Sequence, residues 1–170
     1  MGRGILSATM LGALLLLVGC ADTGPESVAL SLPDRATFPL VADALERRCA
    51  TLDCHGSVGR NLRLYSGSGL RLDPMNLPGS VSTTEAEYDA SYRSLVWLEP
   101  EIMSAVVSEG GAEPERLTLV RKARGTEYHK PGAVIQAGEP ADRCLVSWLA
   151  SKIDEEQCTL AADFGAPGGE

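Results

Sequence analysis

The chain has 170 residues, and its 23 Asp and Glu residues outnumber its 15 Lys and Arg residues, which gives a net charge of −8 at pH 7. Such an acidic chain is poorly suited to bind nucleic acid or to lie on a membrane through a polybasic patch. No Gly-x-Ser-x-Gly, phosphate-loop or His-Glu-x-x-His motif occurs, so the sequence offers no hydrolytic or nucleotide site.

Residues 1–19 have the pattern of a secretory signal peptide. Arg3 supplies a positive charge, and an apolar run over residues 5–18 follows it. The run is shorter than the about 20 residues that span a bilayer. Residues 17–20, Leu-Val-Gly-Cys, look like a lipobox, which predicts cleavage before Cys20 and its lipidation. We therefore expect export and lipid anchoring to the bacterial cell envelope, at the inner or the outer membrane. The alternative is an ordinary signal peptide with an incidental Cys20.

The mature chain is expected to hold one domain between two irregular segments. Residues 20–37 comprise the lipidated cysteine and a linker that contains Gly24, Pro25 and Pro33 and has little helical periodicity, which is typical of a flexible segment. As a coil, this linker would place the domain roughly 25 Å from the lipid. Residues 38–160 form the domain, which is long enough for a modest core, and residues 161–170 form a disordered tail.

The domain is predicted to be mostly α-helical, with short extended segments. Pro39 suits the first turn of a helix, whose apolar stripe, Val41 and Leu45, ends at Cys49. The leucines of residues 62–72 alternate with other types, which is typical of short extended pieces.

Three further signals predict helices after residue 80. Ser82 and Glu85 have the spacing of a capping box, Pro100 can open a helix that Gly110 stops, and Pro140 can open a last helix. Residues 114–123 are ambiguous. Of the large side chains, we expect these to lie in the core: Leu145, Leu149, Met103, Trp97 and Trp148.

The residues with the clearest chemistry follow the first predicted helix. Cys49, Cys54 and His55 resemble the attachment motif of a c-type haem, in which two cysteines form thioether bonds and the following histidine binds the iron. Four residues separate the cysteines here, instead of the common two. Haem c and its iron would be the cofactor, and export agrees with its attachment outside the cytoplasm.

Four short motifs follow one another in the order Cys-x4-Cys-His-Gly at 49–56, Asn-Leu-Arg-Leu at 61–64, Glu-Pro-Glu-Arg-Leu-Thr-Leu-Val-Arg at 113–121, and Trp-Leu at 148–149. This order resembles the cytochrome c-like domains of myxobacterial and planctomycete lipoproteins. The resemblance covers residues 38–158 and implies a small helical electron-transfer domain. The Met-Pro-Pro motif of many such domains is absent, which leaves the second axial ligand open.

Two haem-free alternatives use the same residues. Exported cysteines usually pair, and the four that remain after lipidation of Cys20 allow three disulfide pairings. In that case His55 is a loop histidine, and the protein is a disulfide-stabilised lipoprotein acting as a binding or envelope-structural module. A zinc site would need both histidines together with Cys49 and Cys54, and it ranks last because thiolates rarely stay reduced after export.

If haem takes two cysteines, Cys144 and Cys158 remain and are predicted to form a disulfide. With His55 bound to the iron, His129 is the only other histidine and is our predicted distal ligand, with Met75 as the alternative. The expected function is electron transfer to an unidentified redox partner protein, so a carrier is favoured over an enzyme.

Overall fold

The computed structural model describes Met1 and residues 29–164, so the predicted signal peptide, its cleavage point and Cys20 lie outside the described residues. Within this part, the chain forms helices and no strand, and a single isolated bridge joins Tyr65 to Leu70. The prediction of a mostly α-helical domain is confirmed. The helices are α1 (Phe38–Cys49), α2 (Glu85–Val96), α3 (Pro100–Ser108), the 3-10 turn η1 (Pro114–Arg116), α4 (Thr118–Ala123), α5 (Pro140–Leu149) and α6 (Glu155–Ala162).

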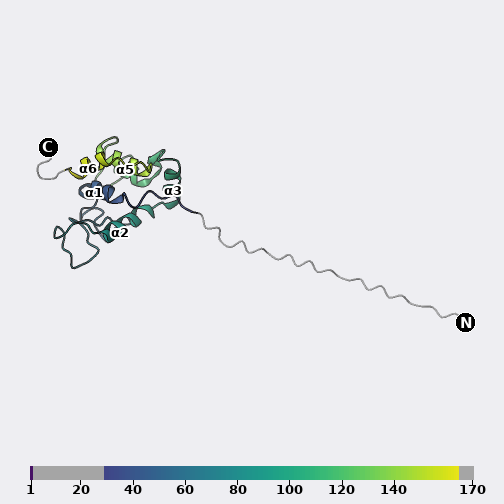
Figure 1. Cartoon of the computed structure of the whole chain (residues 1–170), viewed down its shortest axis with the longest axis horizontal. Coiled ribbons are helices and arrows are strands. Elements are labelled where there is room, and N and C mark those ends of the chain that lie inside the picture. Colours follow the sequence, from purple (N-terminus) through teal and green to yellow (C-terminus); the bar gives the residue numbers. More distant parts are fainter. Residues whose placement is uncertain (2–28, 165–170) are drawn as a thin grey trace.

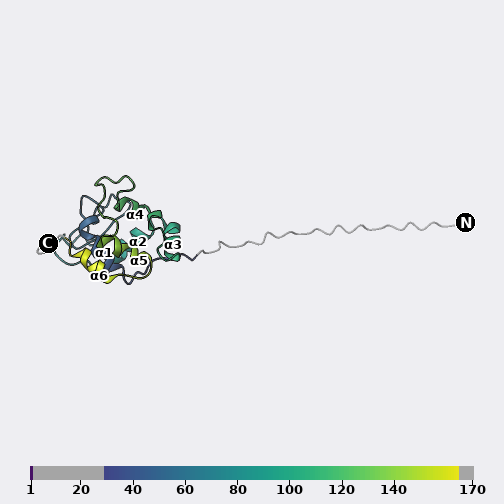
Figure 2. The ribbon, with the colours of Figure 1, turned by 90° about the horizontal axis from the view of Figure 1, so that it is seen from above.

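Helix α1 lies at the centre of the domain. It packs against α5 and α6 on one side and α2 on another (Figure 1). In the view of Figure 2, α1 lies between α4 and α6. The buried stripe of α1, which includes Val41 and Leu45, faces a core where Phe38 contacts Trp148 and Tyr92, with ring centres 5.3 and 5.4 Å apart. As predicted, α1 ends at Cys49.

The start of α2 differs from the prediction by two residues. The capping box is formed by Thr84 and Glu87, and each side chain bonds the backbone N–H of the other. Glu87 is 1% exposed and also forms a buried, two-bonded ion pair with Arg71, at 2.9 and 3.0 Å. Because Glu87 has this buried partner, Thr84 is favoured as the cap over Ser82.

The leucine-rich segment forms the isolated bridge and no strand. The Arg71 guanidinium, besides its ion pair, donates hydrogen bonds to the carbonyls of Gly67, Val81 and Ser82 and so holds this segment against the residues before α2. Leu72, at the end of the alternating pattern, is 46% exposed.

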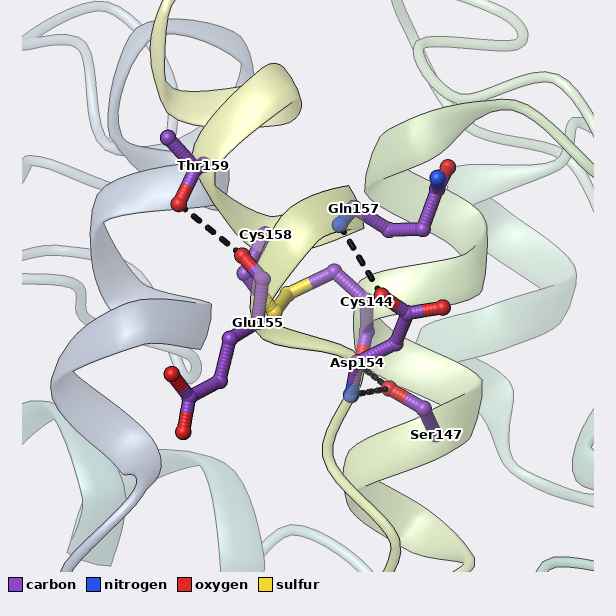
Figure 3. The surroundings of a disulfide bond; sticks show 7 residues. All are labelled: Cys144, Ser147, Asp154, Glu155, Gln157, Cys158 and Thr159. Atoms are coloured by element: carbon purple, nitrogen blue, oxygen red, sulfur yellow. Dashed lines mark hydrogen bonds between the residues drawn. A yellow bond between two sulfur atoms is a disulfide. The ribbon is translucent and has the colours of Figure 1, made fainter.

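Helix α6 was not predicted, and it follows the helix expected to be last. A disulfide joins Cys144 of α5 to Cys158 of α6, which confirms the predicted pair (Figure 3). Both cysteines are buried, and Asp154 caps α6 by accepting a hydrogen bond from the Gln157 backbone. Since α6 continues to Ala162, the domain extends past the predicted boundary at residue 160.

Part of the predicted linker belongs to the domain. Arg35 pairs with Asp89 of α2, and the Trp148 indole donates a 2.8 Å hydrogen bond to the carbonyl of Asp34. Residues 33–37 therefore lie against the helices. No helix in the described part of the chain is long and apolar enough to cross a membrane.

Candidate functional site

The loop that follows α1 brings the haem-type motif into one tight turn. The backbone N–H of Cys54 donates to the Thr51 carbonyl, and that of His55 donates to the Cys49 carbonyl, both at 2.9 Å. Residues 50–53 therefore form the turn itself, and Cys49 and Cys54 both lie next to His55 although four residues separate the two cysteines.

Gly56 allows the loop to close. A β-carbon at this position would lie 2.2 Å from the Ala50 carbonyl oxygen and 2.8 Å from that of Thr51. No side chain can be accommodated at such distances from backbone atoms. Glycine directly after His55 is therefore a steric requirement of this turn.

The imidazole of His55 has one nitrogen engaged and the other available. Its Nδ1 lies 3.1 Å from the Leu62 carbonyl oxygen, which can only accept, so Nδ1 carries the proton. Burial lowers the pKa of His55, and the neighbouring His129 lowers it further, although the Leu62 carbonyl acts in the opposite direction. At neutral pH the ring is therefore uncharged, with a lone pair on Nε2. A metal-binding histidine usually has this arrangement.

Cys49 and Cys54 are free thiols, and both are half-buried. Burial raises the pKa of the Cys49 thiol to about 12, and the nearby Cys54 contributes in the same direction. Cys49 is accordingly a neutral thiol at physiological pH and reacts slowly as a nucleophile.

A cavity of about 410 Å³ opens beside these residues. Cys49 and His55 line it from the loop after α1, and Lys122 and His129 line it from α4 and the segment that follows α4. Its volume lies in the range of small-molecule and cofactor sites, and such sites are mostly apolar. The remaining wall is largely aliphatic and consists of Leu45, Leu62, Leu64, Leu98, Leu119, Ala123 and Val134, with Gly59, Arg60, Asn61 and Thr118.

His129 lies across this cavity from His55. The two ring centres are 5.9 Å apart and the ring planes are 18° from parallel, although the two histidines are 74 positions apart in the chain. This separation is too wide for direct stacking. His129 Nδ1 is buried and has no hydrogen-bond partner among the described residues. Buried polar atoms are normally satisfied, so this atom is one that a bound group could engage.

The loop that carries His129 is attached to α4 by charged side chains. Glu127 pairs with Arg121 at 2.8 Å and with Lys122 at 2.9 Å, and Lys122 also donates to the Tyr128 carbonyl. Hydrogen bonds from Lys122 and Arg121 lower the pKa of the Glu127 carboxyl, so these pairs are formed at neutral pH. They hold the residues just before His129 next to the cavity.

Met75 and Met103 both lie away from the cavity. Met75, the alternative distal ligand, is 84% exposed and does not line the cavity, and Met103 is buried in the core as predicted. Trp97 was expected in the core but is 57% exposed, because it lies at the C-terminal end of α2, where the chain leaves the buried face.

Among the described residues, no group of three or more His, Cys, Asp or Glu side chains could hold a metal ion by itself. A zinc site formed by protein ligands alone needs such a group. A haem differs because the porphyrin supplies four nitrogen ligands, so two protein side chains complete the coordination of its iron.

Sequence reasoning missed several residues of the site. Arg60 lines the cavity and donates hydrogen bonds to the carbonyls of Cys54 and Asp53, at 3.1 Å each, and so supports the loop. No sequence signal singled it out. The buried Leu62 and Leu64 could have been inferred, since their alternation with exposed residues places both on one face.

Comparison of the chain with protein-family models, with curated proteins and with solved structures finds no match. The features of the site therefore have to support any functional conclusion by themselves.

Proposed function

We propose that this protein is a lipid-anchored c-type cytochrome that carries one covalent haem and transfers electrons. Cys49 and Cys54 would hold the haem through thioether bonds, and His55 and His129 would be the axial ligands of its iron. The lipid would be attached at Cys20. When bound, the haem supplies one-electron chemistry between the ferric and ferrous states.

The observation that carries this proposal is the facing pair of histidines. Two imidazoles that bind one metal ion from opposite sides, at about 2 Å each, have ring centres about 6 Å apart. The separation of 5.9 Å between His55 and His129 agrees with this geometry. His55 offers the free Nε2, and the buried Nδ1 of His129 lacks a partner among the described residues.

The free thiols and the cavity support the same cofactor, although Cys49 lines the cavity and Cys54 is not part of its wall. Thioether formation needs two reduced thiols, each of which adds its sulfur and its hydrogen across a vinyl group. Cys49 and Cys54 are the unpaired cysteines of the described chain, whereas Cys144 and Cys158 are bonded to each other. The largely aliphatic wall excludes water from the cavity, as suits the apolar faces of a porphyrin.

The test is expression of the full chain with and without haem-attachment machinery. We expect a red protein that keeps its haem through denaturation, with the low-spin spectrum of two nitrogen ligands and without the weak band of a methionine–iron bond. Cys49→Ala or Cys54→Ala should weaken covalent attachment.

The distal ligand is tested by His129→Ala, with Met75→Ala as its control. We expect the first change to make the iron high-spin and the second to leave the spectrum unaltered. The opposite pattern would assign the ligand to Met75. A colourless wild-type protein, with Cys49 disulfide-bonded in a peptide map, would refute the cytochrome and leave the haem-free, disulfide-stabilised module.

A further inference from the structure

A second groove adjoins the cavity, between the segment 61–65 and helix α2. Its volume is about 410 Å³, and its wall includes Asn61, Arg63, Tyr65, Arg93, Trp97 and Leu98. Asn61 and Leu98 also line the proposed haem cavity, so the two sites share a wall.

Hydrogen bonds attach one side of the groove to the other. The backbone N–H of Arg63 donates to Ser94 Oγ at 2.7 Å, and that of Tyr65 donates to Ser91 Oγ at 2.8 Å. Residues 62 and 64 are buried, so Arg63, on the opposite side of this extended segment, is exposed. The groove is therefore a preformed feature of the surface.

The charge of the groove is opposite to that of the chain as a whole. Within the described residues, the side chains of Arg63 and Arg93 have no ion pair and no hydrogen bond. Most other described arginines do have a carboxylate partner, as Arg71 and Arg124 illustrate. Two uncompensated guanidinium groups thus lie together on a protein with a net charge of −8.

The same groove also exposes apolar surface. Trp97 is 57% exposed and Leu98 is 38% exposed. Trp and Arg are the residue types most enriched where binding energy concentrates in protein interfaces. A guanidinium group binds a carboxylate through two parallel hydrogen bonds.

We propose that this groove docks an acidic segment of a partner protein, with carboxylates on Arg63 and Arg93 and an apolar side chain against Trp97. Docking there would place the partner beside the cavity, and the identification of that partner as a redox protein rests on the proposed function. Binding to the groove itself does not depend on haem.

The test measures binding of a fluorescein-labelled peptide of glutamates with one central leucine to the full chain, by fluorescence anisotropy at low salt. We expect Arg63→Glu and Arg93→Glu each to weaken binding about tenfold or more, as the loss of a charge-assisted hydrogen bond would. Lys152→Glu makes the same change of charge between α5 and α6, where it lines neither site, and should alter binding far less. Trp97→Ala, which leaves the charge unchanged, should weaken binding several-fold.

Equal weakening by Lys152→Glu would show that only net charge matters and would overturn the proposal. So would binding that Arg63→Glu and Arg93→Glu leave intact. If the peptide fails to bind but phosphatidylglycerol vesicles bind through the two arginines, the groove faces anionic lipid and the proposal is wrong. Haem absorption of protein expressed with the haem-attachment machinery separates the two proposals, because peptide binding by such a sample without any haem would refute the cytochrome alone.

Discussion

Removal of the disulfide between α5 and α6 gives a quantitative prediction that does not depend on haem. The perturbation is the double change Cys144→Ala and Cys158→Ala. Both sulfur atoms lie in the core, where the cysteines are 0% and 1% exposed, so alanine introduces no buried polar group there.

The magnitude follows from the length of the closed loop. The two cysteines are separated by 14 positions, and in the chain-entropy model a loop of this size stabilises the fold by about 3 kcal/mol. Loss of two buried sulfur atoms adds a packing cost. For a domain of this length, the melting temperature should fall by about 10 °C.

The assay is thermal and urea unfolding of both proteins, with and without dithiothreitol. We expect the reductant to lower the stability of the wild type toward that of the double variant and to leave the variant unchanged. If the variant loses less than about 1 kcal/mol, the loop-entropy reasoning is wrong. If the variant still responds to reductant, Cys49 and Cys54 form a second disulfide and are not free thiols.

Three further predictions follow from single residues. Glu87→Gln should cost about 3–5 kcal/mol at pH 7 in urea unfolding, because it leaves Arg71 buried without its carboxylate. Burial alone would raise the pKa of Glu87, but hydrogen bonds from the backbone N–H groups of Thr84 and Leu72 and from Arg71 hold it below its ordinary value. The stabilisation that ionised Glu87 gives to the fold is therefore complete above its pKa in the unfolded chain and is lost as the pH falls through its pKa in the folded protein. Glu87→Gln should remove this dependence of stability on acid pH. In haem-free protein, Cys49 should react with iodoacetamide about a thousandfold more slowly than an exposed thiol at pH 7, since the pKa of the Cys49 thiol is raised from 9.0 to about 12. If Cys49 and an exposed thiol react at equal rates, the burial of Cys49 is contradicted. Cys20→Ala should release the protein from membranes or leave it uncleaved, and unchanged processing with retained membrane association would show that Cys20 is not lipidated.

The sequence alone was sufficient where local chemistry decides the structure. The spacing of Val41, Leu45 and Cys49 predicted α1, and Pro100 and Gly110 predicted both ends of α3, because helix periodicity and termini depend on neighbouring residues. The Cys144–Cys158 pair was also inferred, although by elimination and not from geometry.

Tertiary packing decided the features that no local pattern carries. Helix α6 buries few side chains besides Cys158 and exposes Leu160, so it has no apolar stripe to detect, and the disulfide attaches it to α5. The sequence predicted a core position for both Trp97 and Trp148, yet only Trp148 is buried between the helices.

In the candidate site, too, some residues could be predicted from the sequence and others depend on tertiary packing. Cys49, Cys54 and His55 are recognisable because they are close in the chain. The position of His129 opposite His55 depends on α4 and on ion pairs between Glu127 and that helix, and the closed turn at Gly56 depends on the Ala50 carbonyl. Contacts between residues far apart in sequence are set by how the helices pack, and for that reason only the structure could bring the two histidines together.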